Sequence, residues 1–123
     1  IDVSAPVLRY AHARSELLGR RVHFRQADAT RLPWKRDSFD VVVSHILLHE
    51  TSRQALAQIF AECHRVLRPG GVMLHIDVPV RRDDPDVFDR VMADWETDNN
   101  NEPFWRGLHA LDLPRMICDA GFA

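Results

Sequence analysis

Apolar residues recur at intervals of three and four positions in several parts of the chain, the spacing of amphipathic helices. We expect helices over residues 4–19, 51–68, 85–95 and 112–120. Ser4 and Asp112 are candidate N-caps for the first and last of them. Thr51 and Gln54 have the spacing of a capping box, which indicates where the second helix begins. Pro69-Gly70-Gly71 should end that helix and turn directly into a strand.

Shorter stretches carry the pattern of strands, and they are residues 1–3, 21–26, 39–44 and 72–78. Val22 and Phe24 alternate with polar residues, as in a strand with one buried face. Residues 41–43 are consecutive valines, which is typical of a strand buried on both faces of a parallel sheet. Residues 29–38 are expected to form a loop, and residues 122–123 the start of a last strand. The order of elements predicts an α/β fold on a mostly parallel sheet.

The composition of the 123 residues, 46% hydrophobic and 28% charged, is ordinary for a globular domain. A formal net charge of −2 provides no basic field for nucleic acid or an anionic membrane. The apolar runs are much shorter than a membrane-spanning helix, and no signal peptide is visible. Cys63 and Cys118 form no spacing motif, so we expect both to be small buried side chains in a reducing compartment. We therefore expect one cytoplasmic domain, which starts at Ile1 because an N-terminal part is missing.

Four motifs follow one another along the chain and together resemble one enzyme family. They are Ile1-Asp2-Val3-Ser4, Gln26-Ala27-Asp28-Ala29 followed by Leu32-Pro33-Trp34, residues 37–43 and residues 65–71. In this order they resemble the class I S-adenosylmethionine-dependent methyltransferases, and especially the small-molecule branch that is similar to the ubiquinone and menaquinone biosynthesis methyltransferases. The resemblance implies a Rossmann-like, doubly wound sheet with helices on both faces. It also implies S-adenosylmethionine as the cofactor and methyl transfer to a small-molecule acceptor.

The resemblance divides the 123 residues into three parts of a partial domain. Residues 1–78 match the cofactor-binding half, residues 79–110 the substrate lid, and residues 111–123 the last helix and the start of a strand. The family's first strand and its glycine-rich loop would precede Ile1, and its last strands would follow Phe122. Because the glycine-rich loop is missing, we expect these residues alone to bind S-adenosylmethionine weakly or not at all. The missing first strand is central in the family's sheet, so its absence would leave unpaired backbone there. Either these residues are a fragment of a longer chain, or another chain, such as a second copy, completes the sheet.

Four residues are candidates to bind the cofactor at the carboxyl ends of the strands, where doubly wound sheets bind ligands. Asp2 can accept hydrogen bonds from two ribose hydroxyls, and Val3 can pack against the adenine. Asp28 can accept from the exocyclic amino group, while the Ala29 N–H can donate to a ring nitrogen. The alternatives are a helix cap or a plain surface carboxylate at Asp2, and a turn-forming carboxylate at Asp28.

Ser44, His45 and His49 follow the valine-rich strand and are expected at the rim of the cofactor crevice. His49 is the candidate catalytic base, with Glu50 as the carboxylate that orients it, because an imidazole can accept a proton near neutral pH. The alternative is that His49 only packs beside the cofactor. His45 and His49 are four residues apart, but no third ligand at a regular spacing accompanies them, so we expect no metal site. His75, from a central strand, is expected in the core.

Aromatic side chains of the expected lid are candidates for the acceptor pocket. Trp95, Phe104 and Trp105 could form its apolar wall, with residues 99–102 supplying polar contacts. The alternative is that these aromatic residues only pack a lid helix onto the sheet.

Two other functions remain open. A degenerate, non-enzymatic module that acts in assembly would explain the absence of a glycine-rich loop. A nicotinamide-dependent oxidoreductase shares an acidic residue after the second strand. Residues 65–71 and the pair Asp28-Ala29 favour the methyltransferase over the oxidoreductase.

Overall fold

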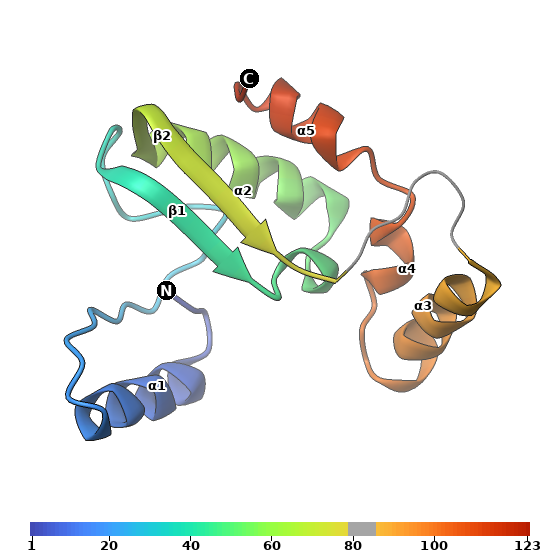
Figure 1. Cartoon of the computed structure of the whole chain (residues 1–123), viewed down its shortest axis with the longest axis horizontal. Coiled ribbons are helices and arrows are strands. Elements are labelled where there is room, and N and C mark those ends of the chain that lie inside the picture. Colours follow the sequence, from blue (N-terminus) through green and yellow to red (C-terminus); the bar gives the residue numbers. More distant parts are fainter. Residues whose placement is uncertain (79–85) are drawn as a thin grey trace.

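The computed structural model describes residues 1–78 and 86–123 (Figure 1). Its elements in chain order are α1 (Ala5–Leu17), β1 (Phe39–His45), the 3-10 helix η1 (Leu48–Glu50), α2 (Arg53–Val66), β2 (Leu67–Ile76), α3 (Val87–Asn99), α4 (Trp105–Leu108) and α5 (Leu113–Asp119). The expected start of the lid at residues 79–85 lies outside the described residues. No helix in the described ranges is long and apolar enough to cross a membrane.

The centre of the fold is a β-α-β unit. β1 and β2 run parallel, with Val41 opposite Val72 and His45 opposite Ile76. α2 connects the two strands and lies against one face of the sheet (Figure 1). The prediction of a parallel α/β arrangement is confirmed. β2 begins at Leu67, five residues before the expected strand at residues 72–78. The prediction that Pro69-Gly70-Gly71 ends the helix is wrong, because α2 ends at Val66 and these three residues lie within β2.

The face of the sheet opposite α2 carries apolar side chains that are between 49% and 56% exposed, namely those of Val41, Val43, Val72, Leu74 and Ile76. The prediction that the valine-rich strand is buried on both faces is therefore wrong for this chain. Side chains alternate between the two faces of a strand, and the described elements cover only the α2 side.

The expected strand at residues 21–26 does not form. Its only ladder contact is an isolated parallel bridge between Asp2 and Gln26, supported by a hydrogen bond of 3.1 Å from the Ala27 N–H to the Asp2 carbonyl oxygen. The expected strand at residues 1–3 is likewise reduced to this bridge. A strand needs a continuous neighbour for its backbone groups, and the alternation of Val22 and Phe24 could not supply one.

Two helix starts test the capping predictions in the first half of the chain. Ser4 caps α1 as expected, with its side chain accepting from the Val7 N–H. α1 nevertheless buries none of its residues, so its apolar positions are not packed on the sheet (Figure 1). The capping box at Thr51 is wrong, because Ser52 is the N-cap of α2 and accepts from the Ala55 N–H. The Thr51 hydroxyl instead donates to the Leu47 carbonyl oxygen at 2.6 Å.

Two boundaries of the C-terminal helices, the end of α3 and the start of α5, lie at residues that the sequence marks as helix breakers or caps. α3 ends at Asn99, where short polar residues compete for backbone hydrogen bonds. Asp112 caps α5 by accepting from the Arg115 N–H at 2.9 Å, as expected. Residues 122–123 are not a strand.

The buried core forms where α2 meets η1 and α4. Leu48, Leu56, Phe60 and Leu108 make one cluster, against which residues of β2 and α5 pack. Cys63 is buried as expected, and burial, followed by the charge of Glu62, raises the pKa of its thiol to about 11. Cys118 is exposed, contrary to the prediction.

One partly buried ion pair, Arg65–Glu62, holds the loop that leads to β1. Arg65 donates to both Glu62 oxygens and to the carbonyl oxygens of Leu32 and Trp34, the last at 2.7 Å. Glu62 in turn accepts from the Leu32 N–H at 2.7 Å. The hydrogen bond from Arg65 holds the pKa of Glu62 below its usual range, although partial burial opposes this. The pair therefore ties residues 32–34 to α2.

We expect the Glu62→Gln variant to lose a pH-dependent part of the stability. Because the folded pKa of Glu62 is lowered, its contribution is present above the ordinary value of 4.5 and is lost as pH falls through the folded pKa. In urea unfolding near neutral pH, the variant should lose about 1 kcal/mol and show a flatter pH dependence below about pH 4.5. Glu16→Gln, on exposed α1, is the control. Equal pH dependence in wild type and Glu62→Gln would contradict this role.

Candidate functional site

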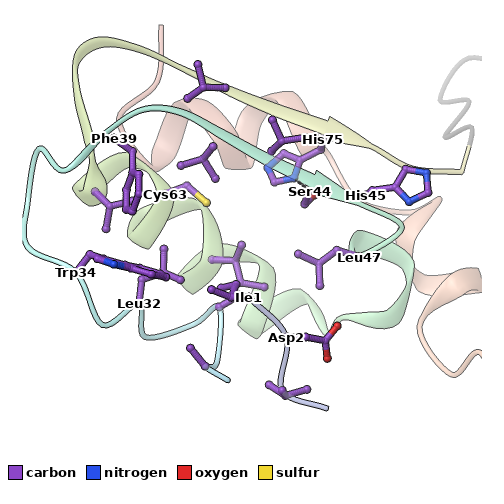
Figure 2. A pocket seen from close by; sticks show the side chains of 18 of the residues that line it. Ile1, Asp2, Leu32, Trp34, Phe39, Ser44, His45, Leu47, Cys63 and His75 are labelled. Atoms are coloured by element: carbon purple, nitrogen blue, oxygen red, sulfur yellow. Dashed lines mark hydrogen bonds between the residues drawn. The ribbon is translucent and has the colours of Figure 1, made fainter. Parts of the chain in front are cut away.

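A hollow of about 420 Å³ separates the N-terminal residues from β1 (Figure 2). Its interior is apolar and includes the side chains of Ile1, Val42, Ile59, Cys63 and Val66. β2 pairs with one edge of β1, and the hollow lies along the other edge. This is where the family resemblance places a further strand.

The end of the hollow at the carboxyl end of β1 is polar. Asp2 approaches it from one side, and Ser44 and His45 from the other (Figure 2). Val3 and Ala29 also line the hollow. Five of the six predicted cofactor residues are therefore brought together around one cavity, although they come from positions up to 43 residues apart in the chain.

Asp2 already has one hydrogen bond, since its Oδ1 accepts from the Ser4 N–H at 2.7 Å. The other carboxylate oxygen makes no hydrogen bond within the described part of the chain. The N-cap of α1 is Ser4, so the alternative that Asp2 is the helix cap is wrong. Asp2 still offers an acceptor beside the hollow.

Asp28 is the predicted cofactor residue that does not line the hollow. Its Oδ1 accepts from both the backbone N–H and the hydroxyl of Thr30, each at 2.8 Å. These bonds lower the pKa of Asp28, the backbone bond most strongly. The turn-forming role is therefore observed, and its neighbours Ala27 and Ala29 contact the hollow instead.

Ser44 is paired with His75 from the neighbouring strand. The Ser44 hydroxyl and His75 Nδ1 are 2.5 Å apart, and both side chains line the hollow (Figure 2). The His75 ring packs edge-on against Phe60, at 5.3 Å between centroids. Burial lowers the pKa of His75, which favours its neutral form. The expected core position of His75 is thus partly observed, because one side of the ring meets Ser44.

His49 is 2% exposed and is held by Asp77. Its Nδ1 lies 2.6 Å from Asp77 Oδ1, and Asp77 Oδ2 accepts from the Leu47 and Leu48 N–H groups, each at 2.7 Å. Burial alone would raise the pKa of Asp77, but the hydrogen bonds from His49 and the backbone outweigh it and lower that pKa. The orienting carboxylate is therefore Asp77, and the prediction of Glu50 in this role is wrong.

Asp77 also stabilises an unusual turn after β1. Ile46 has a φ of 53°, a conformation that β-branched residues rarely adopt. Its N–H donates to the Ile76 carbonyl oxygen at 2.8 Å, and the Asp77 carboxylate holds the two following amides. The turn directs His49 away from the first hollow, whose lining does not include it.

The segment after α3 closes over the other side of His49. The ring centroids of Trp105 and His49 are 4.8 Å apart, and a Glu102 carboxylate oxygen is 3.9 Å from His49 Nε2. Trp95 and Phe104 are 48% and 39% exposed, so they do not form the expected apolar wall within the described residues. Of the predicted lid aromatics, Trp105 alone packs against a candidate catalytic residue.

No sequence pattern indicated a role for Asp77, and Glu102 was expected only as one of several polar contacts of the lid. Asp77 stands at the carboxyl end of a predicted strand, next to the end of β1, which is a usable signal for a site residue. Glu102 could not be assigned to His49 because 53 residues separate the two in the chain.

The comparisons with known proteins give the class. The family model described as "Methyltransferase domain" matches residues 1–71. The chain therefore belongs to the methyltransferase domain family. A crystal structure of a Bacillus halodurans protein assigned as a methyltransferase superposes with a TM-score of 0.78 and 26% identity, covering 98% of this chain and 51% of that one.

Two curated relatives illustrate the range of the family. Methyltransferase GfsG of Streptomyces halstedii is 41% identical over 110 residues, which cover 88% of this chain and 37% of that protein. Demethylmenaquinone methyltransferase of Leptospira interrogans is 36% identical over 81 residues, 63% of this chain and 32% of that protein. The chain thus spans about a third of the length of these relatives.

Proposed function

We propose that this chain is part of an enzyme that transfers a methyl group from S-adenosylmethionine to a small-molecule acceptor. The observation that supports the proposal most strongly is the convergence of Asp2, Ala29 and Ser44 around one hollow, with Asp2 and Ser44 at its polar end. The family resemblance assigns cofactor contacts to this end, and the residues come together through the fold rather than through sequence proximity.

The residues at this end fit the cofactor. Asp2 keeps one carboxylate oxygen for the ribose hydroxyls, and Val3 and Ala29 offer apolar surface and a backbone N–H for the adenine. When bound, S-adenosylmethionine supplies an electrophilic methyl group on a sulfonium. The chain's own contribution is to orient the reactants, since a methyl transfer gains most of its acceleration from positioning.

His49 is proposed as the base that takes the acceptor's proton. With Nδ1 bonded to the Asp77 carboxylate, the lone pair of the neutral imidazole is on Nε2, which faces the segment after α3. Asp77 then fixes both the tautomer and the orientation of the ring. The alternative role, packing without proton transfer, remains distinguishable by kinetics.

The free edge of β1 supports a proposal about partners. Parallel strands are seldom left with an unpaired, apolar edge, and the interior of the hollow beside β1 is apolar. We propose that a further strand, from the same protein or from a second chain, fills the apolar interior and leaves the polar end to the cofactor.

Calorimetric titration of the full-length protein with S-adenosylhomocysteine tests the function. We expect binding in the micromolar range and no binding of nicotinamide dinucleotide. Residues 1–123 alone should bind S-adenosylhomocysteine much more weakly, because a cofactor site that lacks part of its sheet is not preorganised. Preference of the full-length protein for the dinucleotide would favour the oxidoreductase instead, and binding of neither ligand would favour a non-enzymatic module.

A further inference from the structure

A second, polar hollow adjoins the first. It is lined by Glu50, Asn100, Asn101, Glu102 and Pro103, which come from η1 and from the segment after α3. Glu50 lines both hollows. The two cavities therefore meet at η1, at the carboxyl end of β1.

Three side chains of metal-ligand type converge at this junction. One ligand atom from each of His49, Glu50 and Glu102 lies within 4.8 Å of the other two. The His49 side chain is 3% exposed, and its Nε2 is 3.9 Å from Glu102, which is longer than a hydrogen bond. Within residues 1–78 and 86–123 this nitrogen donates or accepts no hydrogen bond. Nε2 of this buried side chain thus faces the carboxylates of Glu50 and Glu102.

The second ring nitrogen of His49, Nδ1, has the kind of partner that histidine ligands have in known metal sites. Histidine ligands commonly donate their second ring N–H to a carboxylate, which fixes the tautomer and the ring orientation. Here Asp77 Oδ1 lies 2.6 Å from Nδ1, and Trp105 packs against the ring. The Nε2 lone pair is therefore held in one direction before any ligand arrives.

The charges at the junction are not balanced by the described residues. Glu50 and Glu102 have no lysine or arginine partner in the part of the chain that the structure describes. Two carboxylates at this distance repel each other, and a cation between them would remove the repulsion.

We propose that His49, Glu50 and Glu102 bind one divalent metal ion at the junction of the two hollows. One imidazole and two carboxylates favour Mn²⁺ or Zn²⁺ over Ca²⁺, which takes oxygen ligands alone. His45, which the sequence analysis considered together with His49 as a possible metal pair, is not part of this cluster. The third ligand comes instead from residue 102.

The consequence for catalysis rests on the proposed function. The ion and the acceptor's proton compete for the same Nε2, so the metal-bound enzyme would rely on the charge of the ion to promote loss of the acceptor's proton. The metal-free enzyme would rely on His49 itself. The binding of the ion can be measured without cofactor or acceptor, so its failure would leave the methyltransferase proposal standing.

Titration of the whole chain with Mn²⁺, followed by electron paramagnetic resonance, tests the site. We expect one ion per chain, with affinity reduced about 10-fold or more in Glu102→Gln and Glu50→Gln. Asp77→Asn should reduce it about 10- to 100-fold by releasing the ring. Glu16→Gln is the matched control, because Glu16 also lies beside a histidine, His12, but on exposed α1. This control should bind like wild type.

A second measurement on the wild-type chain does not depend on the folding of variants. Substoichiometric Mn²⁺ should broaden the imidazole NMR signals of His49 before those of His12. Equal broadening of both histidines, or equal Mn²⁺ affinity in wild type and Glu102→Gln, would overturn the proposal.

Discussion

Replacing His49 with alanine in the full-length enzyme is expected to lower turnover by about 100-fold or more. Cofactor affinity should stay within a few-fold of wild type, because the lost interaction is made only as the acceptor loses its proton. Steady-state kinetics at saturating cofactor, together with calorimetric titration of S-adenosylhomocysteine, separates the two quantities. The experiment requires an acceptor, which a panel of small hydroxyl and amine compounds would supply.

Two further variants test whether the effect of His49→Ala on turnover reflects proton transfer. Asp77→Asn keeps the size of the side chain but weakens the hold on Nδ1, so turnover should fall in the same direction with affinity unchanged. His12→Ala, on exposed α1, should behave as wild type. If His49 only packs beside the cofactor, His49→Ala should instead lower the affinity for the cofactor and change turnover at saturating cofactor little. That outcome would remove the proposed base.

Replacing Asp2 with alanine should weaken cofactor binding by about 30- to 150-fold, equivalent to about 2 to 3 kcal/mol. The reason is the loss of a charged acceptor for two ribose hydroxyls. The measurement is the dissociation constant of S-adenosylhomocysteine in the full-length protein.

Asp2 also accepts from the Ser4 N–H, so the alanine variant alone would mix a structural effect with the binding effect. Asp2→Asn retains an oxygen for Ser4 and removes the charge. It should therefore lose most of the affinity while keeping the thermal stability of wild type. A dissociation constant that is unchanged in both variants would place the ribose elsewhere.

Elements with strong local signals were predictable from the sequence. α5 begins at its predicted cap, Asp112, and β1 coincides with its run of valines. Residues 21–26 have an equally regular alternation but form no strand, because strand formation depends on a neighbour that the pattern does not describe. The burial of Val41 and Val43 was wrong for a similar reason, since the pattern cannot show what covers each face.

In the candidate site, too, residues with a local sequence signal were predictable, and contacts between distant segments were not. Asp2, Ser44 and His45 were predicted because they stand at the ends of expected strands, and these ends meet at one edge of the sheet. The contacts of His49 with Asp77 and Glu102 were not predicted, because they join segments 28 and 53 residues away in the chain. Only packing in three dimensions selects Asp77 over the adjacent Glu50.

We propose that the polar end of the hollow beside β1 holds the nucleoside of the cofactor. A crystal structure of the full-length protein with S-adenosylhomocysteine tests it most directly. We expect the ribose hydroxyls to be hydrogen-bonded to the Asp2 carboxylate, with the adenine beside Val3 and Ala29. A nucleoside bound away from Asp2 would contradict it.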